Sequence, residues 1–349
     1  MKLDNALKNI RELDENAESA SYGRWLSVVK PLFSLGKLEK AITQIAAVRG
    51  GHFELEKKVL VIMCADNGVV SEGISQCGQE VTATVAKSFT EMRSSVCIMA
   101  KRAGVEVLPI DAGMATDVEG LRSIKTAYGT NNIAEGSAMT REQCLEVMEK
   151  SIDIVGELAE NGCDIVLTGE MGIGNTTCAS AVTSALLDMP AEKVTGRGAG
   201  LSSAALDKKI EVIKKAIETN RPDGSDPVDV ISKVGSFDIA AMTGLFIGGA
   251  VYGLPVVIDG FISSAAALAA VRLDERIKNF MLPSHLSKEP AGRMLMEALE
   301  LEPFIDCGMF LGEGSGAVAL MPLLDMALDV YEQLGTFDNW EHEAYRVLR

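Results

Sequence analysis

The chain has 349 residues, of which 47% are hydrophobic and 23% are charged. This balance is typical of a globular protein with a substantial core and excludes disorder as the main state, because the apolar surface suffices to offset chain entropy. The formal net charge of −16 argues against binding to nucleic acid or to an anionic membrane, since neutralising phosphates requires clustered lysines and arginines. A small anionic ligand remains compatible with this charge.

The seven cysteines and three histidines form no recognisable metal or disulfide motif. No C-x-x-C pair occurs, so we expect buried free thiols in a reducing, cytoplasmic environment. His52, His285 and His342 do not form an H-x-x-x-H pair, so we expect neither a metal nor a cofactor. The first residues are charged and lack the apolar core of a secretory signal.

In chain order, a helix is predicted after Ser34, with Gly50-Gly51 at its end. Short apolar runs that end in turn residues then alternate with long segments of helical pattern, such as 142–161 and 207–219. The runs are Val59–Asp66, Val105–Gly113, Cys163–Glu170 and Leu254–Gly260. This alternation predicts an α/β fold: a Rossmann-like parallel sheet with helices on both faces.

Residues 239–258 carry no charge over a length that could span a bilayer. Four glycines and Pro255 interrupt the stretch, and it ends in the β-branched residues 256–258. We therefore favour a buried helix, a turn and a buried strand over a membrane span.

The two ends of the chain are both predicted to be helical. We expect residues 1–50 and 325–349 to form a small helical domain, and residues 51–324 to form the Rossmann-like catalytic domain.

Ligands of open parallel sheets bind beyond the carboxyl ends of the strands, so the turns there are the first candidates for a site. The turn Asp66-Asn67-Gly68 is interpreted as a simple strand end. In the turn Gly169–Thr177, three glycines permit close approach of the backbone to a ligand, and Asn175 to Thr177 can supply donors and a helix N-cap. This turn suits a phosphate. It matches neither a Walker A loop nor G-x-G-x-x-G, which disfavours a nucleotide-dependent oxidoreductase.

Two further turns carry an acid. Asp259 is interpreted either as a ligand of ribose hydroxyls or as a cap of the helix that begins near Ser263. Glu313 lies between glycines before an apolar helix, which fits a general base or an anion-binding loop, although a loop that only caps the helix is the alternative.

Several long motifs, in order from about residue 20 to about residue 335, resemble the nicotinate-nucleotide:dimethylbenzimidazole phosphoribosyltransferases. They are SLGKLE (34–39), CADNGV (64–69), NNIAEGSAMT (131–140), GEMGIGNTT (169–177), KVGSFDIAAMTGL (233–245), LPVVIDGFISSAAAL (254–268), PSHLS (283–287) and LGEGSGAVALMP (311–322). The resemblance implies transfer of phosphoribose from nicotinate mononucleotide to an aromatic base, with release of nicotinate and formation of an α-ribotide for a cobamide. It also implies a Rossmann-like large domain, a small helical domain made from both chain ends, and a dimer.

The resemblance also implies roles for individual residues. Glu313 would be the catalytic base, with a raised pKa, and Glu170 would assist it. Phosphate and ribose would be held by Gly172, Gly174, Asn175, Thr176, Thr177, Lys209, Asp259 and Gly314. The base pocket would contain Cys77, Val85, Met171, Ile173 and Leu311. From the sequence alone, Lys209 could equally belong to a solvated helix face.

This chain departs from the family pattern at three positions. Asn67 stands where many members have His, and Cys77 and Val85 stand where benzimidazole-using members carry a Ser and a Gln. A less polar pocket discriminates less between acceptors. The same reaction with phenol or p-cresol is therefore an alternative. The resemblance implies two further alternatives, a heterodimer with a paralogue in place of a homodimer and a non-catalytic subunit; the presence of Glu313 argues against the last.

Overall fold

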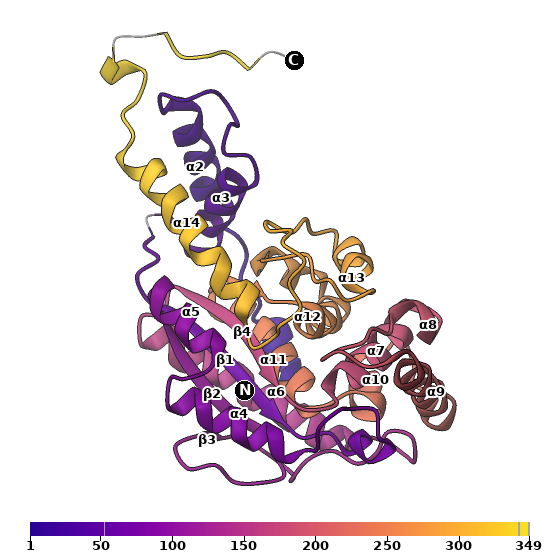
Figure 1. The fold of residues 1–349 in the computed structure, drawn as a ribbon. Coiled ribbons are helices and arrows are strands. Elements are labelled where there is room, and N and C mark those ends of the chain that lie inside the picture. The colour runs from indigo at the N-terminus through magenta and orange to yellow at the C-terminus, as the bar shows by residue number, and fades with distance from the viewer. Residues whose placement is uncertain (52, 341–342, 348–349) are drawn as a thin grey trace.

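The computed structural model describes residues 1–51, 53–340 and 343–347, so that His52 and His342 lie outside the described residues (Figure 1). The chain forms a six-stranded sheet in the order β3-β2-β1-β4-β5-β6, in which all neighbouring strands run parallel. The strands are β1 Lys58–Ala65, β2 Val105–Gly113, β3 Arg122–Ser123, β4 Ile165–Met171, β5 Val256–Ile258 and β6 Met281–Pro283. The predicted fold class is confirmed. Sequence reasoning missed β3 and β6. The 2 residues of β3 are too few to show periodicity, and the 3 residues of β6 lack the longer apolar run that revealed β5.

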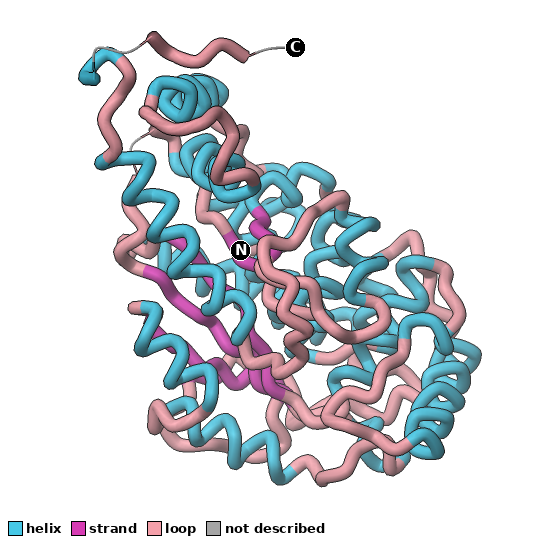
Figure 2. Tube along the Cα trace, turned by 45° about the horizontal axis from the view of Figure 1, so that its top comes forward, coloured by secondary structure: helices cyan, strands magenta, loops and turns pink. Residues whose placement is uncertain are grey.

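Helices cover both faces of this sheet (Figure 2). The first group is α1 Leu3–Lys8, α2 Glu15–Ser27, α3 Lys37–Arg49, α4 Glu80–Thr90, α5 Ser95–Ala103, α6 Arg141–Glu160 and α7 Asn175–Leu187. The second group is α8 Ala191–Val194, α9 Ser203–Asn220, α10 Pro227–Val234, α11 Phe237–Tyr252, α12 Phe261–Leu273, α13 Gly292–Leu299 and α14 Ser315–Gln333.

Each face of the sheet has its own hydrophobic cluster, and β1 contributes to both. Its residues alternate between the cluster with α6, α11 and α12 and the cluster with α4, α5 and α14. The first cluster takes Val59, Val61 and Met63, and the second takes Leu60, Ile62 and Cys64. Burial on both faces explains why the strand is a continuous apolar run with no polar alternation.

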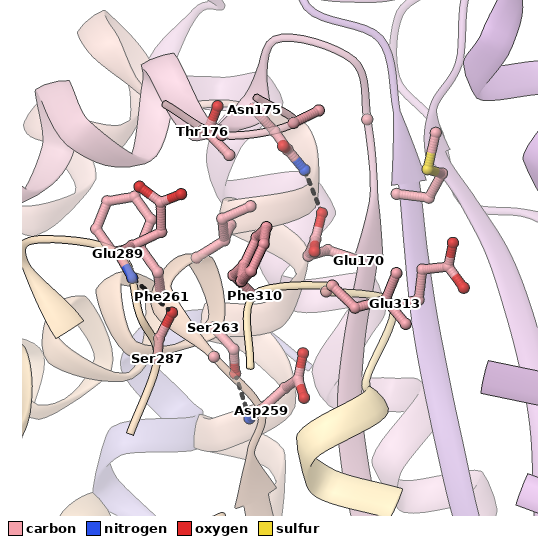
Figure 3. A pocket seen from close by; sticks show the side chains of 18 of the residues that line it. Glu170, Asn175, Thr176, Asp259, Phe261, Ser263, Ser287, Glu289, Phe310 and Glu313 are labelled. Carbon is pink, nitrogen blue, oxygen red and sulfur yellow. Dashed lines mark hydrogen bonds between the residues drawn. The ribbon is translucent and has the colours of Figure 1, made fainter. Parts of the chain in front are cut away.

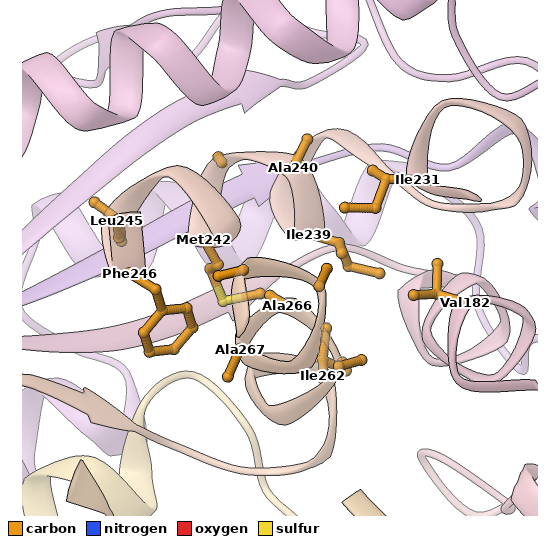
Figure 4. Packing of buried hydrophobic residues seen from close by; sticks show 14 of the residues in the cluster. Val182, Ile231, Ile239, Ala240, Met242, Leu245, Phe246, Ile262, Ala266 and Ala267 are labelled. Atoms are coloured by element: carbon orange, nitrogen blue, oxygen red, sulfur yellow. The ribbon is translucent and has the colours of Figure 1, made fainter. Parts of the chain in front are cut away.

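The uncharged segment 239–258 forms most of α11, a turn at Gly253 with φ +70°, and β5. Met242 and Phe246 of α11 pack against Ala266 and Ala267 of α12 (Figure 4). The interpretation as a buried helix, turn and strand is confirmed. Among the described helices, none is long and apolar enough to cross a membrane.

Helices α2, α3 and the later part of α14 form a projection beyond one end of the sheet (Figure 1). Arg24 of α2 donates hydrogen bonds to the carbonyl oxygens of Tyr331 and Leu334, which ties the two ends of the chain together. The first helix, α1, lies elsewhere, against α6 and α11. The division into domains 1–50 with 325–349 and 51–324 stays a prediction.

The contact between α6 and α11 depends on glycines that bring the two backbones together. A Cβ added at Gly244 would lie 2.3 Å from the carbonyl oxygen of Met148 and 2.8 Å from the Cβ of Ser151. Because one of these atoms is backbone, the helices would have to separate.

We therefore predict that Gly244→Ala lowers the free energy of unfolding by roughly 1–3 kcal/mol, measured by urea denaturation. The matched control is Gly23→Ala on α2, where an added Cβ meets nothing within 4 Å. It should stabilise the protein slightly, by about 0.5–1 kcal/mol, because alanine favours helix. Equal effects of the two substitutions would contradict this account of the α6–α11 contact.

Candidate active site

A pocket lies beyond the carboxyl ends of β4 and β5, close to where the strand order changes direction between β1 and β4 (Figure 3). Its lining comes from five chain segments: 170–176, 198–199, 259–263, 285–289 and 310–313. This is the position at which parallel α/β sheets bind ligands. The structure therefore brings three of the four turns singled out in the sequence to one place.

The turn between β4 and α7 brings backbone close to this pocket. Gly172 lies against β1, where an added Cβ would be 2.3 Å from the carbonyl oxygen of Ala65, and Gly174 has φ +93°. The N-cap of α7 is Gly174, and the described structure shows no side-chain cap there. The expectation that residues 175–177 cap this helix is wrong, because Asn175 turns instead toward two acids. At the start of α7, the amides of Asn175 and Thr177 donate to the carbonyl oxygens of Gly172 and Gly174.

The Asn175 amide group connects two buried carboxylates. Its Nδ2 donates to Oε2 of Glu170 and, at 2.8 Å, to Oδ2 of Asp238. Burial and the charge of Asp238 raise the pKa of Glu170 to about 8. Burial also raises the pKa of Asp238, against hydrogen bonds from Ser236 and Asn175. Glu170 is therefore largely protonated at neutral pH, next to Asp238 at the start of α11.

Sequence reasoning missed Asp238. The available signal was its position as the single charged residue of α11, a helix buried along most of its length. A buried acid at the start of such a helix indicates a polar partner, because an unpaired buried charge is costly.

Asp259 directly follows β5 and is 3% exposed. Its Oδ2 accepts from the Gly314 amide at 3.1 Å, and its Oδ1 accepts from the amides of Gly316 and Ala317 at 2.7 and 3.1 Å. Asp259 therefore caps α14, and the interpretation as a cap of the helix near Ser263 is wrong. The Ser263 hydroxyl instead accepts a hydrogen bond from the Asp259 amide (Figure 3). Contact of Asp259 with ribose stays a prediction.

Glu313 lies in a bend in which three successive residues have positive φ: Gly312 at +83°, Glu313 at +60° and Gly314 at +90°. Its Oε2 is buried and has no hydrogen-bond partner among the described residues. Burial raises the pKa of Glu313, and the charge of Asp259 adds to this, while a hydrogen bond from the Val96 amide opposes it. The Glu313 carboxylate points away from Glu170 (Figure 3), although the Glu313 amide donates to the Glu170 carboxylate.

An adjoining cavity shares the turn 172–176 and adds Cys77, Arg197 and Lys209. Lys209 is 1% exposed, and its Nζ donates to Oγ1 of Thr176 at 2.9 Å and to the carbonyl oxygen of Gly196 at 3.3 Å. Burial lowers the pKa of Lys209 to about 8. Lys209 therefore does not belong to a solvated helix face. Sequence reasoning missed Arg197.

The five predicted base-pocket residues are not equally close to these cavities. Met171, Ile173 and Leu311 line the first, and Cys77 lines the second. Val85 is half-buried on α4 and packs against the hydrophobic cluster that contains Met171. Thr177 is buried on α7, with an Oγ1 that has no partner among the described residues. The roles of all these residues stay predictions.

Comparisons with known proteins give matches over nearly the whole chain. A family model described as phosphoribosyltransferase matches residues 10–341. The nicotinate-nucleotide–dimethylbenzimidazole phosphoribosyltransferase of Acetivibrio thermocellus is 48% identical over 97% of this chain and 98% of its own. The enzyme of the same name from Clostridium acetobutylicum is 42% identical over both full lengths. The crystal structure of CobT from Thermus thermophilus is similar with a TM-score of 0.87 and 34% identity, covering 94% of this chain and 99% of that one.

The raised pKa of Glu170 has a consequence for stability. Between its ordinary pKa and about 8, the folded state holds a proton that the unfolded state has released, so stability falls as pH rises through this interval. We predict that Glu170→Gln removes this loss. Relative to the wild type, the variant should gain roughly 2–4 kcal/mol in unfolding free energy between pH 5 and pH 8.

Urea denaturation across that pH range measures the difference between the two proteins. Glu218→Gln, at an exposed position of α9, is the control and should run parallel to the wild type. A Glu170→Gln curve parallel to the wild type would contradict the raised pKa.

Proposed function

The chain belongs to the nicotinate-nucleotide–dimethylbenzimidazole phosphoribosyltransferase family, and we propose that it transfers phosphoribose from nicotinate mononucleotide to an aromatic base such as 5,6-dimethylbenzimidazole. The enzyme is a pentosyltransferase. The products would be nicotinate and an α-ribotide that enters the nucleotide loop of a cobamide. The reaction would take place in the cytoplasm, in a dimer made of two copies or of this chain and a paralogue.

The chemistry of this reaction suits a pocket of carboxylates. The donor carries a cationic pyridinium nitrogen, so the bonding electrons return to that nitrogen when its bond to the ribose breaks, and nicotinate leaves without a proton. The acceptor nitrogen attacks the same carbon from the opposite face, which inverts β to α. The other ring nitrogen of the acceptor then has a proton to lose, and one carboxylate suffices to take it.

We assign that proton to Glu313. The observation that carries this assignment is its buried carboxylate oxygen, which has no hydrogen-bond partner among the described residues. The raised pKa makes the carboxylate a stronger base. The charge of Asp259 in the pocket lining, where three backbone amides stabilise it, would favour positive charge on the ring and on the ribose in the transition state.

The phosphate would lie at the start of α7. The turn Gly172–Thr177 would supply the positive end of α7 and the Thr176 hydroxyl, and Lys209 would supply a cation in the lining of the adjoining cavity. A phosphate dianion there would favour the charged form of Lys209 over the neutral form that burial favours. Glu170 and Gly314 complete the proposed substrate contacts.

We predict that Glu313→Gln lowers the turnover rate by about 10²–10⁴-fold, because the amide cannot accept the proton. Chromatography of nicotinate and α-ribotide formed from nicotinate mononucleotide and 5,6-dimethylbenzimidazole measures this rate. Glu302→Gln, at a side chain that is 78% exposed, is the matched control and should behave as the wild type. A Glu313→Gln enzyme as active as the wild type would remove Glu313 from the mechanism.

Phenol or p-cresol is a second candidate acceptor, which would be joined to ribose through oxygen. Cys77 lines the adjoining cavity with a thiol, and Met171, Ile173 and Leu311 contribute further weakly polar or apolar side chains to the two cavities. Such a lining lacks the hydrogen-bonding groups by which a polar pocket would select a benzimidazole over other acceptors.

We predict that a competition between 5,6-dimethylbenzimidazole and phenol yields both ribotides with the wild type. The double substitution Cys77→Ser with Val85→Gln should shift the product ratio toward the benzimidazole by about 10-fold or more, because it restores polar partners. Each product is measured by chromatography from one reaction. Exclusive use of dimethylbenzimidazole by the wild type would rule out the broadened acceptor range.

A further inference from the structure

Asp259 is placed to act on the bend that carries Glu313. The bend and the first turn of α14 offer backbone amides that lack partners within the helix, as at every helix N-terminus. The N-cap of α14 is Gly314, which has no side chain to satisfy them. Asp259, more than 50 residues earlier in the chain, accepts hydrogen bonds from three of these amides, those of Gly314, Gly316 and Ala317.

We infer that Asp259 is a positioning residue, whose carboxylate holds the Gly312–Gly314 bend in the conformation that directs Glu313 toward the acceptor base. This inference rests on the proposed function, in which Glu313 removes the proton. It gives Asp259 a role other than contact with ribose.

The bend needs such a restraint because its backbone is in an unfavourable conformation. A residue with a side chain is strained in the left-handed region, and Glu313 has φ +60°. Conformations of this kind persist only where the surroundings enforce them. Bonds from backbone amides to a carboxylate are about twice as strong as neutral ones, so three of them outweigh the strain.

Asp259 is itself held from several sides. Its amide donates to Oγ1 of Thr168 on β4 at 3.3 Å and to Oγ of Ser263 on α12 at 3.2 Å. Its carbonyl oxygen accepts from the hydroxyl of Ser284, just after β6, at 2.9 Å. The ends of β4, β5 and β6 therefore fix the carboxylate, and the carboxylate fixes the bend.

The bend also fits closely against the sheet. A Cβ added at Gly169 would lie 2.7 Å from the carbonyl oxygen of Glu313, and one added at Gly314 would lie 2.3 Å from Cδ1 of Leu60. Little space is left for the bend to relax while Asp259 holds it. If the carboxylate were lost, the amides would be left buried without partners, and the bend would move to satisfy them.

The charge of Asp259 gives a second way to observe this role. It raises the pKa of Glu313, together with burial. The other groups on this side are Glu170, which accepts from the Glu313 amide, and His285, which lines the pocket together with Asp259. Removing the charge of Asp259 should therefore shift the acid limb of the rate profile, which reports deprotonation of Glu313, to lower pH.

The test is Asp259→Asn, assayed with nicotinate mononucleotide and 5,6-dimethylbenzimidazole. We expect kcat to fall by about 10–100-fold, because a displacement of about 1 Å at the base has that effect. KM for nicotinate mononucleotide should change less than about 3-fold, and the acid limb of kcat should move to lower pH. Hydrogen exchange of the amides of residues 314–317 should become faster.

The matched control is Asp226→Asn. Asp226 also caps a helix through two backbone amides, those of Val228 and Asp229, but in α10, outside the lining of the pocket. The Asp226→Asn enzyme should have a lower free energy of unfolding than the wild type and the same kcat and KM. If Asp259→Asn does not fold, Ser284→Ala can replace it, because it removes only the hydrogen bond from the Ser284 hydroxyl to the Asp259 carbonyl oxygen. This substitution should lower kcat by about 2–5-fold at constant KM.

An Asp259→Asn enzyme with a strongly raised KM, an unchanged kcat and an unmoved acid limb would overturn the inference and favour a ribose contact. If Ser284→Ala kept the wild-type kcat and the amides of residues 314–317 still exchanged slowly, the positioning role of Asp259 would also be contradicted. Failure of the proposed function itself appears separately, as full activity of Glu313→Gln.

Discussion

The site depends on placing several carboxylates out of water at the carboxyl edge of a parallel sheet. Each of them is stabilised by groups that belong to other elements: the Asn175 amide group for Glu170 and Asp238, and three backbone amides of α14 for Asp259. In the pocket lining, Glu313 and Glu289 each keep a buried carboxylate oxygen without a partner among the described residues. Of these two acids, Glu313 is the one in the bend whose amides Asp259 holds.

The sheet makes this arrangement possible. Because both faces are covered by helices, the strands are apolar and their polar residues are confined to the ends. The carboxyl ends of β4 and β5 then bring residues 170–176 and 259–263 to one pocket, and α14 adds its N-terminal bend. The close contact of α6 with α11 through Gly244 places the N-terminus of α11, with Asp238, behind Glu170.

Much of this was predictable from local patterns. The alternation of apolar runs and helical segments predicts the parallel sheet, and the turns after the runs predict which acids meet at its edge. Local patterns do not reveal which partner a polar group finds across the fold. The Asp259 carboxylate caps a helix more than 50 residues later in the chain, and Asn175 turns away from the helix that it begins. Lys209 appears in the sequence as one charge among several, and only the packing of α9 on α7 buries it.

The role of Glu313 as the base can be examined in a crystal structure of the enzyme with the α-ribotide of 5,6-dimethylbenzimidazole. We expect an oxygen of Glu313 within about 2.6–3.2 Å of the ring nitrogen that does not carry the ribose, with the Asp259 carboxylate still bound to the amides of α14. A product complex in which Glu313 lies away from the ring, or in which Asp259 leaves those amides to bind the ribose, would contradict it.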